Sequence, residues 1–287
     1  MDHTEQQKAL IQWWKMSSRD LPWRQTRDPW LIMVSELMLQ QTQVNRVIPK
    51  YQHFIKKYPT PKKCSEAPAS SIIEAWEGLG YNRRAINLHR TSRVIVETHY
   101  GKVPNTLNDL LELPGIGPYT ARAILCFAFE EDIGVVDVNI HRIISRVTGK
   151  ALSPLEMQIK ADNFVPAGEG WIWNQALMDL GSDVCGSRSP DCGRCPIMSH
   201  CLWKGEGPDP AKRKTSFSNL NQSFEGSDRQ GRGKLVNTLR NRRVFLSELE
   251  KVMGWNGDPE RCRRVAAGLI KDGLVEYDDK AGYGLPS

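Results

Sequence analysis

The sequence has no apolar run that approaches the roughly 20 residues needed to cross a membrane as a helix. Its first residues, Met1-Asp2-His3-Thr4-Glu5, show neither the basic nor the apolar region of a signal peptide. Strict alternation of apolar and polar residues is scarce, whereas apolar residues recur at helical spacing as far as position 203. We therefore expect no membrane contact, little β-structure, an all-α body and reduced thiols in an intracellular compartment.

What remains is an ordinary globular composition. The 287 residues are 40% hydrophobic and 25% charged, enough for one large domain and a small one. A net charge of +6 suits an anionic partner such as nucleic acid, although solvated surface lysines give the same balance. Charge alone therefore does not identify the partner.

Four of the seven cysteines lie within seventeen residues, and their spacing is Cys-x6-Cys-x2-Cys-x5-Cys. Structural zinc usually takes two tight Cys-x2-Cys pairs, and only one such pair is present. A [4Fe-4S] cluster accepts wider and uneven spacing, so the pattern favours a cluster over zinc and over free or disulfide-bonded thiols. The predicted ligands are Cys185, Cys192, Cys195 and Cys201.

A glycine-rich segment, residues 113–121, separates two expected helices, one over 107–111 and one that carries Ile124 and Phe127. Gly115 and Gly117 allow a tight turn that exposes backbone N–H groups at the start of the second helix, where a phosphate can bind without a basic side chain. The pattern predicts a helix-hairpin-helix that anchors DNA. A glycine-rich turn without a ligand is the alternative.

Two carboxylates suit the cleavage of a glycosidic bond. Asp137 stands at the expected start of a helix that bears Ile143 and Val147, where the helix N-terminus favours an ionised carboxylate facing a developing sugar cation. Glu36 shares a helix face with Gln40 among apolar neighbours, which suits proton transfer near neutral pH. Asp137 as a plain N-cap and Glu36 on a polar helix stripe are the alternatives.

The C-terminal region has a different composition. Residues 204–232 are rich in Gly, Pro, Ser, Asn and Lys and predict an exposed linker. After it, residues 235–239, 245–253 and 259–271 predict three short helices, and residues 273–284 predict a β-hairpin. The sequence thus predicts a large helical domain over 1–203, the linker, and a winged-helix-like domain over 233–287.

With these motifs in place, the chain resembles the helix-hairpin-helix DNA glycosylases that carry an iron-sulfur cluster, and within them the MutY-like adenine DNA glycosylases. The resemblance extends over residues 5–203. It rests on the hairpin, the Asp137 motif and four further segments: Leu21-Pro22-Trp23-Arg24, residues 35–44, Gly78-Leu79-Gly80-Tyr81 and residues 174–181. It implies two lobes: a helical lobe over 22–130, with the hairpin near 107–129, and a cluster lobe formed by 1–21 and 131–203.

The resemblance also implies roles for single residues. Glu36 protonates the adenine ring and later activates water, Asp137 stabilises the sugar cation, and Tyr119 and Asn139 support them. The implied base pocket consists of Leu21, Trp23, Arg24, Gln41, Val44 and Gln175. The implied DNA contacts are Gln40, Gln41, Thr42, Tyr81, Gly115 and Gly117. An enzyme of this kind flips the base out of the duplex before cleaving it.

The resemblance further implies base excision of adenine opposite 8-oxoguanine or G in double-stranded DNA. The hairpin carries no lysine that forms a Schiff base with the sugar, so we expect a monofunctional enzyme that leaves an abasic site. The 84 residues after Trp203 are too few for the Nudix-like domain common in that family. Thymine or uracil excision opposite guanine is the alternative, and a non-enzymatic iron-sulfur DNA-binding regulator is a third. A cytoplasmic, nucleoid-associated monomer is expected.

Overall fold

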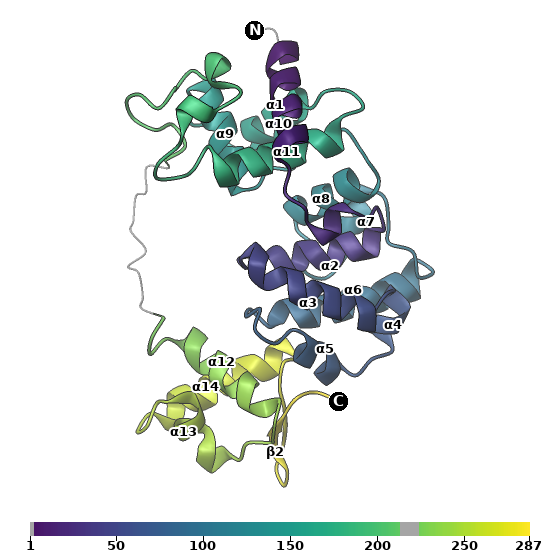
Figure 1. The fold of residues 1–287 in the computed structure, drawn as a ribbon. Coiled ribbons are helices and arrows are strands. Elements are labelled where there is room, and N and C mark those ends of the chain that lie inside the picture. The colour runs from purple at the N-terminus through teal and green to yellow at the C-terminus, as the bar shows by residue number, and fades with distance from the viewer. Residues whose placement is uncertain (1–2, 213–223) are drawn as a thin grey trace. The chain divides into compact units, whose positions relative to one another are not determined.

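The computed structural model describes residues 3–212 and 224–287, and in these residues the protein is built mostly from helices (Figure 1). The prediction of an all-α fold is confirmed. The chain forms two compact units. The first contains residues 1–32, 105–112 and 116–216, and the second contains residues 33–104, 113–115 and 217–287. Residues 213–223, which fall in the predicted linker, lie outside the described residues.

The first unit packs helices from distant parts of the chain around one core. Its core side chains include Leu10, Ile144 and Trp173, which come from three different helices. A capping box of Ser153 and Glu156 fixes the start of a further helix, which begins at Pro154. The elements of this unit are α1 (His3–Ser17), η1 (Pro22–Arg24), α7 (Leu107–Glu112), α8 (Pro118–Ala128), α9 (Val138–Thr148), α10 (Pro154–Phe164), α11 (Gly170–Asp183), η2 (Cys192–Arg194) and η3 (Met198–His200).

The second unit joins helices from the middle of the chain to the C-terminal region. Helix α2 (Pro29–Leu39) begins in the first unit and continues into this one. The other elements are α3 (Val44–Lys57), α4 (Pro61–Ser65), α5 (Ala69–Ala75), α6 (Arg83–Thr98), α12 (Asp228–Leu239), η4 (Leu246–Glu248), α13 (Leu249–Met253), α14 (Pro259–Asp272), β1 (Glu276–Asp278) and β2 (Gly282–Gly284). Strands β1 and β2 pair antiparallel, with Tyr277 opposite Tyr283.

The C-terminal elements follow the sequence prediction with two differences. Helix α12 begins at Asp228, inside the predicted linker, because the Ser227 side chain accepts a hydrogen bond from the Gln230 backbone and caps the helix there. The segment predicted as one helix over 245–253 is instead the 3₁₀ turn η4 followed by the short helix α13. The hairpin is present. The winged-helix arrangement, the linker and the lobe boundaries stay predictions.

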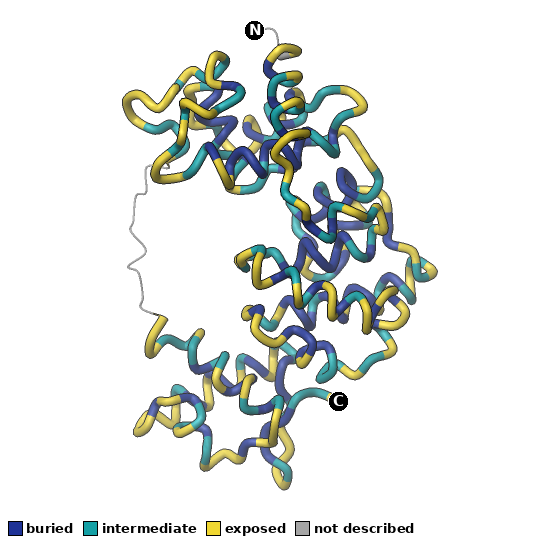
Figure 2. Tube along the Cα trace, in the orientation of Figure 1, coloured by how far each residue is buried: buried dark blue, intermediate teal, exposed yellow. Residues whose placement is uncertain are grey.

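Helix α2 is buried over most of its length. Every residue from 32 to 38 is buried, including the polar Ser35 and Glu36, as the dark blue stretch of α2 in Figure 2 shows. A helix that is apolar on all sides is typical of a protein interior. Among the residues that the structure describes, no helix combines the length and apolarity of a membrane span.

Candidate functional site

The predicted hairpin is present between α7 and α8. Gly115 adopts φ +81°, a left-handed conformation in which other residues are strained, and a Cβ atom there would lie 2.5 Å from Nδ2 of Asn87. Gly117 is the N-cap of α8, and Pro118 occupies the first turn, so the backbone N–H groups at this end are not used within the helix. This geometry is typical of an anion-binding turn. The half-buried Tyr119 lies in the first turn of α8.

The Asp137 carboxylate is held in a fixed orientation at the start of α9. Its Oδ1 accepts hydrogen bonds from the backbone N–H groups of Asn139 at 2.8 Å and Ile140 at 2.7 Å. Its Oδ2 accepts a third bond from Nδ2 of Asn139 at 2.9 Å. Asn139 is itself oriented, because Nη2 of Arg142 donates to its Oδ1 at 2.8 Å. The structure therefore brings Asp137 and Asn139 together, and Arg142 is a supporting residue that the sequence analysis missed.

Burial and hydrogen bonding act on Asp137 in opposite directions. Burial raises the pKa of the Asp137 carboxyl above its usual range, and this outweighs the three hydrogen bonds and the Arg142 charge, which lower it. The sequence predicted only the second effect, through the helix N-terminus. A carboxylate with a raised pKa is a stronger base, and it carries its negative charge in surroundings with little water to screen it.

Helix α11 fixes the backbone that leads to Asp137. The Asn174 side chain accepts from the backbone N–H of Val135 at 2.8 Å and donates to the carbonyls of Ile133 and Gly170, each at 2.8 Å. At the other end of α11, a Cβ atom on Gly181 would lie 2.5 Å from Cβ of Asn139, so only glycine permits this approach of α9 and α11. Gln175, one of the predicted pocket residues, is buried on the same helix.

Asp179 on α11 anchors the predicted pocket segment around η1. Arg24 donates to both of its carboxylate oxygens, with Nη1 at 2.8 Å from Oδ2 and Nη2 at 2.9 Å from Oδ1. Arg19 and the Trp14 indole donate as well, with Nε at 2.6 Å and Nε1 at 3.0 Å. The Arg24 guanidinium is thus bonded to Asp179. The predicted pocket residues Leu21 and Trp23, which are close to Arg24 in the sequence, are buried.

Replacement of Asp179 by asparagine is expected to destabilise the protein by about 3 kcal/mol at pH 7, because it leaves Arg24 buried without its partner. Burial raises the pKa of the Asp179 carboxyl, but the hydrogen bonds and charges of Arg24 and Arg19 outweigh this and hold it below its usual range. The stabilisation is therefore present above the unfolded pKa and lost as pH falls through the folded pKa. Denaturant unfolding at several pH values measures both effects.

The matched control for this variant is Asp183→Asn on the same helix. Asp183 is exposed, and its ion pair with Arg194 at 3.1 Å lies at the surface. Exposed pairs contribute little, so the control should change the free energy of unfolding by less than about 0.5 kcal/mol. Equal losses in the two variants would contradict a special role for Asp179.

Glu36 lies in the second unit, on the buried stretch of α2, and only 5% of the residue is exposed. Past the end of this helix, Gln41 is exposed and adopts φ +55°, and Val44 opens α3. The half-buried Gln40 and Thr42 lie on either side of Gln41, and the Thr42 hydroxyl is 3.3 Å from the carbonyls of Gln40 and Leu79. The predicted motif thus forms a helix end and a turn that joins the loop before α6.

Arg84 organises this turn, and the sequence analysis did not identify it. Its guanidinium donates to the carbonyls that end α2 and to the loop before α6, and the residue is 7% exposed. Nη1 lies 2.8 Å from the Leu37 carbonyl and 2.9 Å from that of Met38, and Nη2 lies 3.0 Å from the Gly80 carbonyl. Burial lowers the pKa of Arg84 to about 10. The loop that bears Tyr81 is therefore tied to the helix that bears Glu36.

Arg84→Lys is expected to reduce the free energy of unfolding by about 3 kcal/mol, because a lysine ammonium cannot satisfy the buried carbonyls that the planar guanidinium reaches. Arg83→Lys is the matched control, since the Arg83 side chain is 67% exposed and 3.7 Å from Asp272. It should change stability by about 0.5 kcal/mol or less. Denaturant unfolding of both variants measures the difference, and a loss of the same size in Arg83→Lys would contradict the assignment.

The four predicted cluster ligands line one small cavity of about 20 Å³. Burial first, and then the charges of the other three thiols, raise the pKa of Cys195 to about 11. Nη1 of Arg146 donates to Sγ of Cys185 at 3.2 Å, and the Lys204 backbone N–H donates to Sγ of Cys201 at 3.4 Å. Among the described residues, no three His, Cys, Asp or Glu side chains are placed to hold a metal ion.

The donor set, four thiols around one cavity, is chemically suited to an iron-sulfur cluster, whose positive iron atoms would stabilise the thiolates. Hydrogen bonds to sulfur are typical of such sites. Arg146, which the sequence analysis missed, is 2% exposed and also pairs with Asp209, with 2.7 Å between Nη2 and Oδ2.

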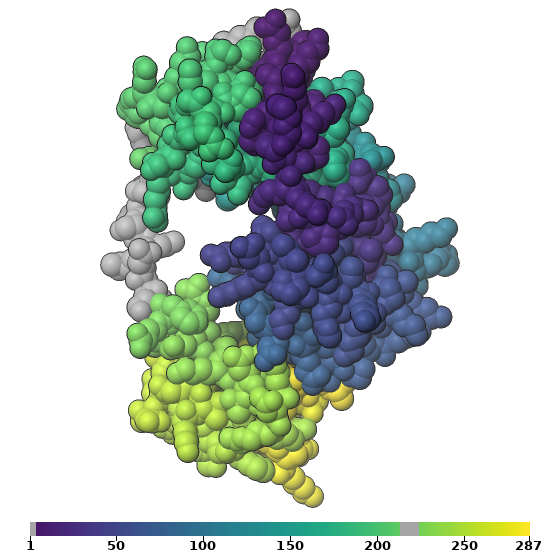
Figure 3. All heavy atoms as spheres, in the orientation of Figure 1, coloured from purple at the N-terminus to yellow at the C-terminus, as the bar shows by residue number. Residues whose placement is uncertain are grey.

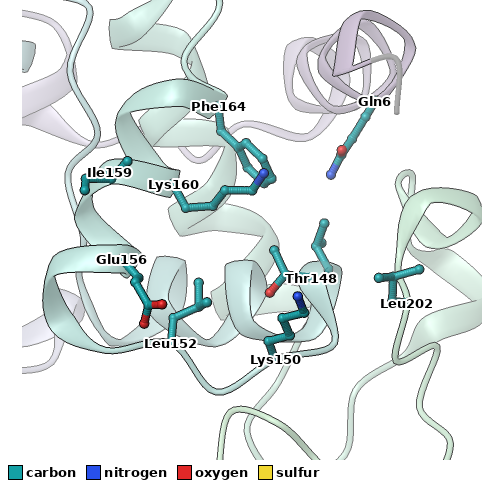
Figure 4. Close-up of a pocket in the computed structure, with 10 residues that line it drawn as sticks. Gln6, Thr148, Lys150, Leu152, Glu156, Ile159, Lys160, Phe164 and Leu202 are labelled. Carbon is teal, nitrogen blue, oxygen red and sulfur yellow. The ribbon is translucent and has the colours of Figure 1, made fainter.

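A larger cavity in the first unit contains none of the predicted site residues. It has a volume of about 440 Å³, and its apolar lining comes from α9, α10 and the loop between them, with Leu152 in the loop and Phe164 at the end of α10 (Figure 4). Nζ of Lys160 lies 4.6 Å from the centre of the Phe164 ring. Glu156, Lys150 and Lys160 also line this cavity, and the Glu156 carboxylate is bonded to Ser153 in the capping box of α10.

Comparison with known proteins identifies the family of this chain. Residues 34–166 match the family model described as HhH-GPD superfamily base excision DNA repair protein. An adenine DNA glycosylase of Mycolicibacterium smegmatis is 40% identical over 281 residues, which are 96% of this chain and 94% of that relative. The chain belongs to the HhH-GPD superfamily.

Two further members of the HhH-GPD superfamily are similar over a smaller part of the chain. A thymine/uracil-DNA glycosylase of Methanothermobacter thermautotrophicus is 33% identical over 201 residues, which are 68% of this chain and 91% of that relative. The solved structure of a thermostable thymine-DNA glycosylase is 31% identical, has a TM-score of 0.67, and matches 71% of this chain and 96% of that one. The match to the adenine enzyme extends across nearly all of this HhH-GPD chain.

Proposed function

We propose that this protein is an adenine DNA glycosylase of base excision repair, which hydrolyses the N-glycosidic bond of a mispaired adenine and leaves an abasic site. The observation that supports it most is the match to the adenine enzyme over 96% of this chain. That match includes most of the C-terminal region, so the small tail does not argue against adenine as the substrate.

In the proposed reaction Glu36 protonates the adenine ring, which makes the base a better leaving group, and afterwards activates the attacking water. Asp137 stabilises the positive charge that develops on the sugar as the bond breaks. The Asn139 amide and the two backbone N–H groups hold this carboxylate in place. Tyr119 stands where a lysine would make the enzyme bifunctional, which favours a simple hydrolase.

The remaining proposed contacts position the DNA. The base pocket consists of Leu21, Trp23, Arg24, Gln41, Val44 and Gln175, and Arg24 contributes through its stem because its guanidinium is bonded to Asp179. Gly115 and Gly117 bind a backbone phosphate through N–H groups, and Gln40, Gln41, Thr42 and Tyr81 contact the duplex around the extruded base. DNA enzymes that act on a flipped base fill the gap in the stack and read the base in a pocket.

The test of this function is single-turnover base release on four duplexes that are identical except for one pair: adenine opposite 8-oxoguanine, adenine opposite G, thymine opposite G, and uracil opposite G. Strand cleavage after alkali at adenine alone supports the proposal, and cleavage before alkali contradicts a monofunctional mechanism. The thymine and uracil duplexes test the second candidate, which the 31% identity to a solved thymine-DNA glycosylase supports. Release from these two alone overturns the adenine proposal.

Cys185, Cys192, Cys195 and Cys201 are proposed to hold a [4Fe-4S] cluster, which would crosslink residues 185–201. We expect roughly four iron atoms per chain in anaerobically purified protein. Cys192→Ser should lower the iron content, the visible absorbance of the cluster and the stability together, because the cluster stabilises the fold that binds it. Metal analysis measures this, and one zinc ion per chain without iron would contradict it.

A further inference from the structure

The C-terminal region is joined firmly to the helices around Tyr81. Its core includes Ile73 of α5 and Ile86 of α6 together with side chains of α12 and α14. Nη2 of Arg240 donates to the Ile73 carbonyl at 3.2 Å and to Oδ1 of Asn82 at 3.3 Å. All these residues belong to the second compact unit, whose C-terminal helices, green to yellow in Figure 3, pack against the blue helices. The position of the C-terminal region relative to Tyr81 is therefore defined.

The exposed side chain of Arg229, at the start of α12, contacts two exposed aromatic side chains, Phe224 and Tyr81. Tyr81 lies in the loop before α6, here called the Tyr81 loop. Nη1 of Arg229 donates to the Tyr81 hydroxyl at 3.3 Å. The guanidinium of Arg229 also lies 5.7 Å from the centre of the Phe224 ring. Phe224 is 59% exposed and Tyr81 is 45% exposed. An exposed arginine between two exposed aromatic rings is an arrangement that binds nucleic acid, because the rings stack on bases and the cation attracts phosphate.

The charge of Arg229 is available, whereas most other arginines of the C-terminal region are neutralised. Arg242 pairs with Glu248, Arg243 with Glu276, and Arg232 with Asp272. Asp228, the acidic neighbour of Arg229 in sequence, is shared by Arg261 and Arg264 at 2.7 and 2.8 Å. No ion pair among the described residues includes Arg229. These five arginines are thus paired with carboxylates, and Arg240 is bonded to the Ile73 carbonyl and Asn82.

The Tyr81 loop is rigid enough to serve as one side of such a contact. Tyr81 has φ +47°, and the carbonyls of Leu79 and Gly80 just before it accept hydrogen bonds from Arg84 at 3.2 and 3.0 Å. Because this loop is already ordered in the free protein, binding loses less conformational entropy there. Arg229 contacts this loop through the Tyr81 hydroxyl, so the start of α12 and the loop lie next to each other.

We propose that Phe224, Arg229 and Tyr81 form a DNA contact contributed jointly by the C-terminal region and the Tyr81 loop, in which Arg229 binds a backbone phosphate beside the base step that Tyr81 enters. This inference rests on the proposed function, because that function places Tyr81 in the duplex. It gives the small C-terminal region a role in holding the substrate, and it assigns that role to Arg229.

The experiment measures binding to a duplex that holds a tetrahydrofuran abasic analogue opposite 8-oxoguanine, by fluorescence anisotropy from 50 to 200 mM salt. Binding to this analogue requires no catalysis, so a failure of adenine release by the wild-type protein remains a separate result. Arg229→Gln is expected to weaken binding about five- to tenfold and to reduce the slope of log K against log salt by about 0.9, the value for one lost phosphate contact. Arg229→Lys keeps the charge and should keep the slope.

Arg93→Gln is the matched control. This substitution also removes one positive charge from the second unit. Arg93 is exposed and pairs with Glu97 at 3.6 Å. It lies ten residues along α6 from Arg83, which is about 15 Å at 1.5 Å per residue. Its variant should bind with wild-type affinity and slope. An unchanged slope in Arg229→Gln, or an equal loss in Arg93→Gln, overturns the proposal.

Discussion

Replacement of Glu36 by glutamine is expected to lower the single-turnover rate of adenine release by about 10³-fold, within the range for loss of a general acid. Glutamine has nearly the same shape as glutamate but no proton to give to the adenine ring. Because residues 32–38 of α2 are all buried, a side chain of the same volume keeps the packing of this helix. Quenched single-turnover assays on the duplex with adenine opposite 8-oxoguanine measure the rate.

The matched control is Glu97→Gln, which removes an exposed carboxylate from α6 in the same unit. It should leave both the rate and the stability unchanged. Glu36→Gln should still bind the abasic duplex, since the protein contacts that position the DNA are intact. A rate within tenfold of the wild type would remove Glu36 from the chemistry and leave it as a buried polar residue of a core helix.

Asp137→Asn is expected to reduce the rate of base release by about 10²- to 10³-fold, the usual effect of removing one group that stabilises transition-state charge. Asparagine is as good an N-cap as aspartate, so α9 should form normally and the free energy of unfolding at pH 7 should stay within about 1 kcal/mol of the wild type. The asparagine amide loses the bond from Asn139, and this offsets the relief of removing a buried charge.

The pH dependence of stability distinguishes this account from a simple capping role. Burial raises the folded pKa of Asp137 above its unfolded value, so the folded state holds the proton more tightly. The wild type should therefore lose stability relative to Asp137→Asn as pH rises through the folded pKa, and the difference should be constant below the unfolded pKa, about 4. Denaturant unfolding between pH 4 and pH 8 checks the trend, and a relative gain by the wild type with rising pH would contradict it.

Asp137→Ala serves as the companion variant because it removes both the charge and the cap. It should be about 1 kcal/mol less stable than Asp137→Asn and no more active. If alanine were inactive and asparagine retained the wild-type rate, the role of Asp137 would be to cap α9, and its proposed part in catalysis would be wrong.

Much of the site's local structure was predictable because it depends on residues close together in the chain. The hairpin requires Gly115 to adopt a left-handed turn, and the residues on either side of it form helices by their own spacing. Asp137 caps α9 through backbone groups two and three residues away. The four cysteines lie within seventeen residues, so the spacing alone places them near one cavity.

Charged residues that support the site were missed because their partners are distant in sequence. Asp179 receives hydrogen bonds from Arg24 across 155 residues, and Arg84 reaches the end of α2 across 44 to 47 residues. No local pattern distinguishes these from surface charges. The only available signal was a charged residue inside an otherwise apolar helix segment, as with Asp179 among the buried residues of α11.

By itself, the sequence determined the all-α class, the hairpin, the thiol set and the capping carboxylate, since each follows from the conformational preferences of a short segment. Only the tertiary structure decided which charged side chains are paired within the protein and which are free to bind a ligand. It neutralised most arginines of the C-terminal region, buried Arg84 against backbone carbonyls, and left Arg229 beside Tyr81, 148 residues away in the chain. The physical reason is that a charge is neutralised by a partner within a few ångströms, and folding, rather than distance along the sequence, decides which partner that is.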